Sequence, residues 1–196
     1  RDHLANELGL RPSDIQVIPN GLDVKQWRNK RKLAKKIDLF GVLEKTKVIL
    51  FVGRLTGPKG DIVRFLISNV LQEVEQKTGC VFCVVGGLKV PDDIPALIEA
   101  ANQQLGRETV ILKEFQNNIA PYLQTADLVI ASGRVAMESL LVGKPTVAFG
   151  ETNYHGLITK ESFEEAARTN FGDTGVVRPP ERDRVAKDLI LLLKRG

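Results

Sequence analysis

The sequence predicts an α/β fold, a Rossmann-like doubly wound parallel sheet with helices on both faces. Short apolar runs alternate with amphipathic segments along most of the chain, and strict alternation is typical of right-handed βαβ units. The run Val48–Val52 is apolar at every position, as expected for a strand that a parallel sheet buries on both faces. Because no linker, repeat or low-complexity tract interrupts the pattern, we expect residues 1–196 to form one domain.

The first half of the chain contains five predicted elements. They are a helix over residues 2–9 closed near Gly9, a short strand at Ile15–Pro19 before an Asn20-Gly21 turn, a helical segment from Leu33 to Phe40 that ends at Gly41, a strand at Lys47–Val52, and a long helix over residues 60–77. The long helix has apolar residues at helical spacing on one side, which is the side expected to pack on the sheet.

The second half repeats the alternation of strands and helices. Strands are predicted at Val81–Val85, Thr109–Leu112, Asp127–Ala131, Pro145–Phe149 and Gly175–Val177, and helices at Asp93–Leu105, Asn118–Gln124, Gly133–Val142, Lys160–Thr169 and Glu181–Lys194. The polar, Gly-bounded segment Gly150–Thr159 is expected to be a loop.

Composition restricts the classes of protein to which the chain can belong. The net charge is +4, which is mild and predicts no nucleic-acid partner. The apolar runs are too short to span a bilayer, and no N-terminal segment has the form of a signal peptide. Two cysteines suggest a reducing compartment, so we expect a cytoplasmic location. Because the chain begins with Arg1 and its only methionine is Met137, we expect it to be part of a longer protein.

Two stretches combine a strand, a Gly-containing turn and the start of a helix. They are Phe51–Gly60 and Ala126–Glu138. The start of a helix presents unpaired N–H groups and the positive end of a dipole, which suits an anion. The first stretch adds the cations Arg54 and Lys59, and the second adds the carboxylate of Glu138 about one and a half turns into its helix. Cations for a diphosphate and a carboxylate for sugar hydroxyls predict a nucleotide-sugar site.

The common phosphate-binding motifs are absent. Lys59 is followed by Gly60-Asp61 instead of the Ser or Thr of a Walker A loop, and Val85-Gly-Gly-Leu-Lys89 lacks the spacing of a dinucleotide-binding motif. An ATPase and an NAD enzyme are therefore both disfavoured. Ligands of open parallel sheets bind beyond the carboxyl ends of the strands, and both stretches fall on that edge.

Four segments in register give the chain a family resemblance. They are Val17–Asp23, Phe51–Leu55 followed by Lys59-Gly60, Ala126-Asp127, and Glu138 with Gly143–Ala148. With these segments the chain resembles the C-terminal, donor-binding half of a GT-B glycosyltransferase, closest to family 4, the group 1 glycosyltransferases. The resemblance covers nearly the full chain.

The resemblance implies a role for each candidate residue. Arg54 and Lys59 would neutralise the donor diphosphate, the backbone amides of Gly133, Arg134 and Val135 would hold phosphate oxygens, Glu138 would bind the ribose hydroxyls, and the turn Lys113-Glu114-Phe115 would lie near the base. It also implies glycosyl transfer to an acceptor held by a missing N-terminal domain, with retention at the anomeric carbon, no bound metal and no cofactor.

One departure from the family pattern leaves the chemistry open. Many members carry a glutamate eight positions before the ribose-binding one, where this chain has Ile130, and the loop before Glu138 is short. In this respect the chain resembles GT-B enzymes of peptidoglycan lipid synthesis and UDP-N-acetylglucosamine 2-epimerases. A UDP-sugar epimerase and a non-catalytic nucleotide-binding module therefore remain alternatives to a glycosyltransferase.

Several further residues have two interpretations. Ser132 is either a helix N-cap or a phosphate contact, and Arg134 is either a phosphate cation or a solvated side chain. The loop residues Thr152, Asn153 and His155 are candidates for contacts in the cleft.

Two other patterns have a structural interpretation beside a functional one. Cys80 and Cys83 have metal-ligand spacing, but we interpret them as buried structural thiols because no second ligand pair lies nearby. The basic stretch Lys25–Lys36, with Trp27, is interpreted as a solvated helix face, with contact to anionic lipid at the inner face of the membrane as the alternative.

Overall fold

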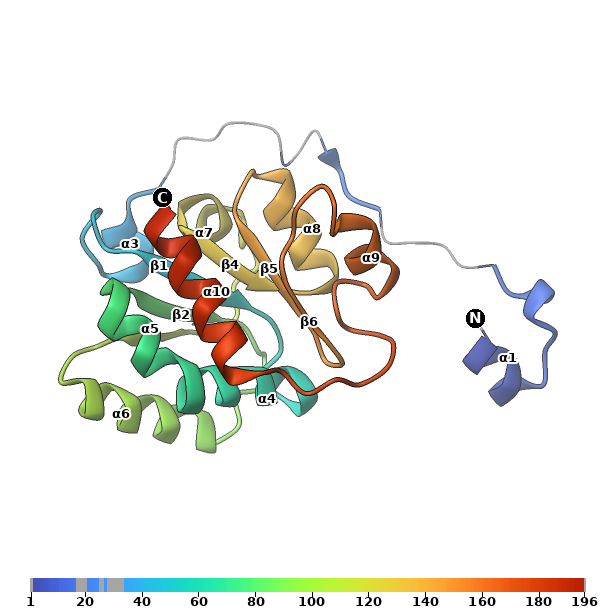
Figure 1. The fold of residues 1–196 in the computed structure, drawn as a ribbon, viewed down its shortest axis with the longest axis horizontal. Helices are drawn as coiled ribbons and strands as arrows, with labels where there is room; N and C mark the ends of the chain where they lie inside the picture. Colours follow the sequence, from blue (N-terminus) through green and yellow to red (C-terminus); the bar gives the residue numbers. More distant parts are fainter. Residues whose placement is uncertain (1, 17–20, 25–26, 28–33, 196) are drawn as a thin grey trace.

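A computed structural model describes residues 2–16, 21–24, 27 and 34–195 of the chain. Its centre is a six-stranded sheet with the strand order β3-β2-β1-β4-β5-β6 (Figure 1). The first five strands in the sequence pair in parallel, and β6 is antiparallel to β5. The predicted doubly wound α/β sheet is therefore confirmed, with one antiparallel strand at its edge.

The strands and helices follow the predicted order closely. The strands are β1 (Val48–Val52), β2 (Val81–Val85), β3 (Val110–Lys113), β4 (Leu128–Ala131), β5 (Thr146–Phe149) and β6 (Tyr154–Leu157). The helices described are α1 (Asp2–Leu8), a 3-10 turn at Pro12–Asp14, α3 (Lys36–Phe40), α4 (Gly57–Phe65), α5 (Leu71–Thr78), α6 (Asp93–Leu105), α7 (Ala120–Thr125), α8 (Gly133–Leu141), α9 (Phe163–Arg168) and α10 (Arg182–Arg195). Among the described residues, no helix is both long and apolar enough to cross a membrane.

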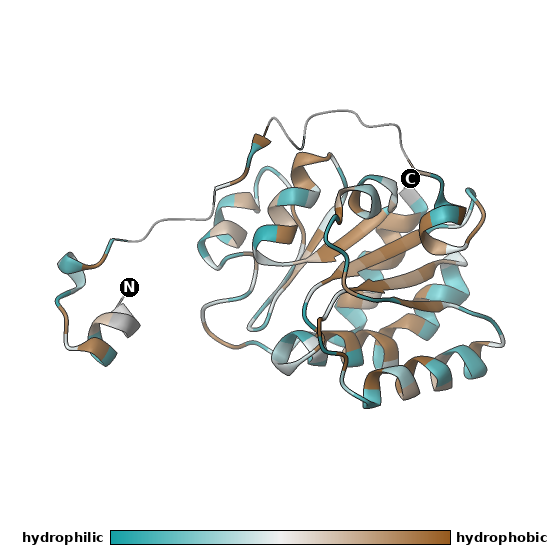
Figure 2. Ribbon diagram, turned by 180° about the vertical axis from the view of Figure 1, so that it is seen from behind, coloured by the Kyte–Doolittle hydropathy of each residue, from teal (hydrophilic) through white to brown (hydrophobic). Residues whose placement is uncertain are grey.

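Helices cover the sheet on both faces, as the apolar strands require. On β1, Ile49 and Phe51 pack with α4, α5, α6 and α10, whereas Val48 and Leu50 pack with α3, α7, α8 and α9. Figure 1 shows α10 running across the same face as α4 and α5, and Figure 2 shows apolar strands between helices that carry both polar and apolar residues. A strand with apolar side chains on both faces is held in register by both layers.

The long helix predicted over residues 60–77 contains an irregular turn. The segment Leu66–Val70 is a π-helix that joins α4 to α5 without a break. Its buried residues Leu66, Ile67 and Val70 belong to the same core cluster as both flanking helices. The extra residue of the wider turn therefore leaves the packing on the sheet intact.

The strand predicted at Gly175–Val177 is wrong. Val176 and Val177 are exposed in an irregular segment, and the sheet edge beside β5 is occupied by β6, from the segment predicted as a loop. Only four residues, 150–153, connect β5 to β6, and such a short connection permits only antiparallel pairing. The predicted strand at Ile15–Pro19 is not formed at Ile15 and Gln16, and Val17–Asn20 lie outside the described residues.

The interpretation of Lys25–Lys36 as a solvated face fails at its C-terminal end. Lys36 is buried and its Nζ donates to Asp127 Oδ2 at 2.6 Å and to Thr46 O at 2.8 Å. Asp127 also accepts from the Val48 amide at 2.7 Å, so this carboxylate ties the amino end of β1 to Lys36. Trp27 packs against the core, whereas Lys25, Gln26 and residues 28–33 lie outside the described part of the chain.

Two glycines bring the carboxyl ends of β1 and β2 unusually close. Gly53 donates its N–H to Val85 O at 3.1 Å, and Gly86, at φ +139°, lies against the Gly53 carbonyl. A Cβ added at Gly86 would lie 2.1 Å from Gly53 O. The close approach of these two backbones therefore requires glycine at position 86.

Gly86→Ala is expected to lower the free energy of unfolding by at least about 2 kcal/mol, because it adds a clash to an unfavourable backbone conformation. Gly79→Ala is the matched control, since Gly79 lies at the other end of β2 with φ +66° and has no neighbour within 4 Å of an added Cβ. It should cost about 1 kcal/mol. Urea unfolding of both variants measures the difference, and equal losses would contradict the close approach.

Candidate functional site

The carboxyl ends of the parallel strands gather the candidate residues at one edge of the sheet. Arg54 follows β1, Lys113 ends β3, and Ser132 follows β4. Gly86, after β2, donates its N–H to Lys113 O at 3.4 Å. The two stretches that predicted an anion site therefore lie on neighbouring strands, because β1 pairs with β4 in parallel.

Arg54 precedes α4 in the sequence, and Lys59 lies within its first turn. Arg54 is exposed, and its Nη2 donates to Glu151 Oε1 at 3.2 Å. Lys59 lies in the first turn of α4, and its Nζ donates to Asp173 Oδ1 and to Ser132 Oγ. Its side chain is only 13% exposed. Both cations therefore already pair with carboxylates of the chain itself.

At the start of α8, one backbone N–H group donates a hydrogen bond and the next two have no partner among the described residues. Gly133, with φ +54°, donates its N–H to Asn170 O at 3.0 Å. The N–H groups of Arg134 and Val135 have no hydrogen-bond partner among the described residues. Ser132 is the N-cap residue by position, but its side chain makes no capping hydrogen bond and instead accepts from Lys59. The start of α8 therefore offers two backbone donors and has the Lys59 ammonium beside its N-cap residue.

Glu138 is a buried carboxylate with a single hydrogen bond at its side chain. It is 4% exposed, and Arg134 Nε donates to its Oε1 at 2.7 Å. Arg134 itself is 65% exposed and lies one turn earlier on α8. Within the described part of the chain, Oε2 of Glu138 has no partner. Oε2 is not among the fully enclosed unpaired side-chain atoms of the described residues, so it keeps contact with solvent and is open to a ligand hydroxyl.

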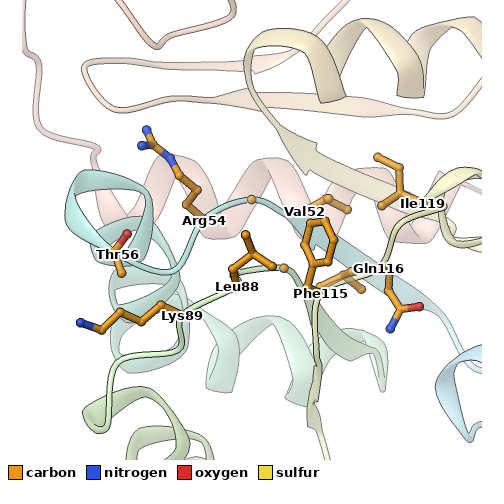
Figure 3. A pocket seen from close by; sticks show the side chains of 12 residues that line it. Val52, Arg54, Thr56, Leu88, Lys89, Phe115, Gln116 and Ile119 are labelled. Atoms are coloured by element: carbon orange, nitrogen blue, oxygen red, sulfur yellow. The ribbon is translucent and has the colours of Figure 1, made fainter.

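An apolar hollow of about 350 Å³ lies where β1, β2 and β3 end (Figure 3). It is lined by residues after each strand, including Arg54, Leu88, Phe115 and Ile119. Figure 3 shows Leu88 and Phe115 at its centre and Arg54 at its rim. Of the predicted base-proximal turn, Phe115 lines the hollow with its side chain, whereas Lys113 and Glu114 do not line it.

Leu88 is a lining residue that sequence reasoning missed. It is 89% exposed, which is unusual for a leucine in a chain with two large buried clusters. The sequence feature that could have indicated Leu88 is its position directly after Gly86-Gly87, at the end of β2. An apolar side chain that a strand end presents to solvent beside Phe115 offers a surface for a flat apolar ligand.

The residues predicted as a cleft loop hold a second segment in place. Thr152 Oγ1 donates to Gly172 O at 3.0 Å, and the Asn153 amide donates to the same carbonyl at 3.1 Å. Thr152 and Asn153 also line a smaller hollow of about 250 Å³ beside Glu151 and Phe149. The β5–β6 connection is thus one half of a hydrogen-bonded pair of loops, and its role in the cleft stays a prediction.

His155 on β6 forms a hydrogen bond with the side chain of Thr169. The Thr169 hydroxyl donates to Ala166 O at 3.0 Å and accepts from the Gly172 amide at 3.2 Å, so it accepts again from His155 Nε2 at 2.7 Å. This arrangement assigns the proton of the neutral imidazole to Nε2. The ring therefore supports the segment that follows α9.

Sequence reasoning also missed the two carboxylates that pair with the cations. Glu151 follows Arg54 by 97 positions and Asp173 follows Lys59 by 114 positions. No local pattern could predict pairs so distant in the sequence.

The interpretation of Cys80 and Cys83 as buried thiols is confirmed, and burial raises the pKa of Cys80 to about 11 and that of Cys83 to about 12.

Desolvation by burial lowers the pKa of His155 below its ordinary value of 6.5. The unfolded chain then binds this proton more readily, so the stability that His155 contributes is present above pH 6.5 and is lost as the pH falls. We expect the free energy of unfolding to fall more between pH 7.5 and 5.5 in the wild type than in His155→Gln, which keeps a donor for Thr169. Urea unfolding at both pH values tests this, and an equal fall in the two proteins would contradict it.

Comparisons with known proteins agree with this architecture. A family model described as "Glycosyl transferases group 1" matches residues 46–195. The D-inositol 3-phosphate glycosyltransferase of Segniliparus rotundus is 30% identical over 155 residues, which are 74% of this chain and 34% of that protein. This chain therefore spans about a third of the length of that curated relative.

Solved structures share the fold at low sequence identity. HepE from Anabaena, in complex with UDP, matches with a TM-score of 0.62 at 21% identity, covering 97% of this chain and 50% of that one. WaaG, a glycosyltransferase involved in lipopolysaccharide biosynthesis, matches with a TM-score of 0.64 at 17% identity, covering 98% and 51%. These matches confirm the predicted resemblance to the C-terminal domain of a GT-B protein. Because the family model covers residues 46–195, the chain belongs to the group 1 glycosyl transferases.

Proposed function

We propose that this chain binds a nucleoside diphosphate sugar and is the donor-binding part of an enzyme that transfers the glycosyl group to an acceptor. The observation that carries the proposal is Glu138, whose side chain is buried and whose Oε2 has no hydrogen-bond partner among the described residues. Glu138 lies on α8, the helix whose N-cap residue, Ser132, accepts a hydrogen bond from Lys59. A carboxylate for hydroxyls and a cationic helix start for phosphates, beside an apolar hollow, match the three parts of a nucleotide sugar.

The diphosphate would bind between Arg54 and Lys59. Arg54 follows β1, Lys59 contacts Ser132 after β4, and the amides of Arg134 and Val135, which have no partner among the described residues, supply neutral donors. As the bond to the sugar breaks, negative charge develops on the leaving diphosphate. Fixed cations and amides stabilise that charge in the transition state more than in the bound donor, which accelerates transfer.

The base would occupy the hollow that Leu88 and Phe115 line. The relative HepE is solved in complex with UDP and with UDP-glucose, which supports uracil as the base that this chain takes. Phe115 and Leu88 offer apolar surface on which a ring can pack.

The finer assignments belong to the same proposal. They are membership of family 4, retention at the anomeric carbon, a cytoplasmic location and an acceptor held by a further domain. The relatives extend well beyond the matched region, which supports a second domain as the source of acceptor contacts.

The double variant Arg54→Ala/Lys59→Ala should weaken binding of UDP by about 100-fold, because each charge-assisted hydrogen bond to phosphate is worth about 1.5 kcal/mol or more. Calorimetric titration with UDP, GDP and ADP measures this and identifies the base. The matched control is Lys77→Ala/Arg107→Ala, which removes two cations that pair with Glu73 and Glu75 on α5. An equal loss in the control, or no loss in the site variant, would refute the proposed diphosphate contacts.

Glu138→Gln separates the ribose contact from the rest of the site. If Glu138 binds the ribose hydroxyls, the variant should bind UDP about tenfold more weakly while its affinity for 2′,3′-dideoxy-UDP, which lacks both hydroxyls, changes little. Titration of the wild type and the variant with both ligands completes a thermodynamic cycle that measures the coupling between Glu138 and the ribose hydroxyls. A uniform loss for the two ligands would show that Glu138 supports the fold of α8 and does not bind the ribose.

A further inference from the structure

Each cation of the proposed diphosphate site pairs with a carboxylate from a distant segment. Glu151 lies in the β5–β6 connection and contacts Arg54, and Asp173 follows α9 and contacts Lys59. The Asp173 side chain is 18% exposed and that of Glu151 is 25% exposed, so both carboxylates are largely enclosed. The two anions therefore take the place at which an anionic ligand would meet these cations.

Asp173 also lies at the start of α8. Its Oδ2 is 3.0 Å from the position that a Cβ on Gly133 would take, and its Oδ1 contacts Lys59. Asn170 contributes the carbonyl that accepts from the Gly133 amide. One short segment, residues 170–173, thus supplies both a carboxylate and a carbonyl to the helix start at which a phosphate is expected.

The two carboxylates belong to one connected pair of loops. Gly172 O accepts from the amides of Thr152 and Asn153 at 2.9 and 3.1 Å. The backbones of Gly150 and Gly172 are so close that a Cβ on Gly150 would lie 2.0 Å from the Gly172 carbonyl carbon. Glu151 also donates its amide to Asp173 Oδ1 at 3.4 Å. The loops that carry the two carboxylates are therefore joined by direct backbone contacts.

We propose that Asp173 and Glu151 are internal counter-ions that the donor diphosphate must displace from Lys59 and Arg54. The inference rests on the proposed function, because it assigns these two residues to the same site. In the ligand-free chain the carboxylates neutralise the cations, and in the complex the phosphates take over. Asp173 and Glu151 thereby set the affinity of the site for its donor.

Charge balance explains why the carboxylates must leave. A diphosphate placed between Arg54 and Lys59 would lie beside two carboxylates in a partly enclosed site, where like charges repel strongly. If the paired arrangement dominates in the ligand-free chain, the observed affinity is reduced by the small fraction of molecules in which the cations are free. Removing one carboxylate charge raises that fraction.

The experiment compares UDP binding by the wild-type chain, Asp173→Asn and Glu151→Gln, with calorimetry as the readout. Asn and Gln keep the size of each side chain and an oxygen for the hydrogen bonds. The control is Glu75→Gln on α5, which removes a carboxylate of similar burial, 15% exposed, from its ion pair with Arg107. Unfolding curves establish that each variant is folded, and Glu151→Gln still tests the inference if Asp173→Asn is not.

Asp173→Asn is expected to bind UDP on the order of tenfold more tightly than the wild type, with a smaller gain for Glu151→Gln and none for Glu75→Gln. Weaker or unchanged binding by Asp173→Asn, with wild-type binding intact, would overturn the inference and show that Asp173 orients Lys59 for the ligand. An equal gain in Glu75→Gln would also overturn it, as an effect of net charge. Absence of UDP, GDP and ADP binding in every protein, folded variants included, would instead refute the proposed function.

Discussion

The parallel alignment of β1 with β2 and β4 determines where every candidate group lies. Phe51 is in register with Val84 on one side and with Ile130 on the other, so the three strands end at the same edge. Their side chains are buried on both faces, and a slip of one residue would exchange the two apolar layers. The register is therefore firmly held, and it carries Arg54, Leu88 and Ser132 to neighbouring positions.

Close backbone contacts complete the site beyond the sheet. Gly86 lies against Gly53, and Gly150 lies against Gly172, at distances that no side chain would permit. The two glycines of the first contact line the apolar hollow, and the second contact joins the loops that carry Glu151 and Asp173. Glycines at these positions thus act through proximity, because they let loops from different strands share one small volume.

Sequence patterns predicted the elements whose signals are local. The apolar run of β1 and the helical spacing before Gly79 and Gly106 are readable within a dozen residues, and α6 was predicted with its observed bounds. The pattern of β6 was not readable, since a histidine and a glycine interrupt its alternation between buried and half-buried positions. Its place depends on the short connection from β5, which is a property of the assembled sheet.

The site residues were likewise predictable where their signal lies in the neighbouring sequence, but their contacts with distant residues were not. Arg54, Lys59 and Glu138 could be proposed because a strand end or a helix start lies next to each of them in the sequence. The environment of these residues could not be predicted, because Asp173 reaches Lys59 across 114 positions and Asn170 reaches the amide of Gly133 from beyond α9. Likewise, Lys36 looked like part of a solvated basic face until its contact with Asp127 placed it in the core.

The pairing of two cations with two linked carboxylates also bears on which anion the site selects. A single anionic group can replace Asp173 at Lys59 or Glu151 at Arg54, but it leaves the other pair holding both loops through the Gly172 carbonyl. Two phosphates on one molecule can replace both carboxylates, and the second replacement is then intramolecular and costs far less entropy. A connected pair of internal anions therefore favours a diphosphate over a monophosphate by more than the difference in charge, so the loops that close the site also contribute to its selectivity.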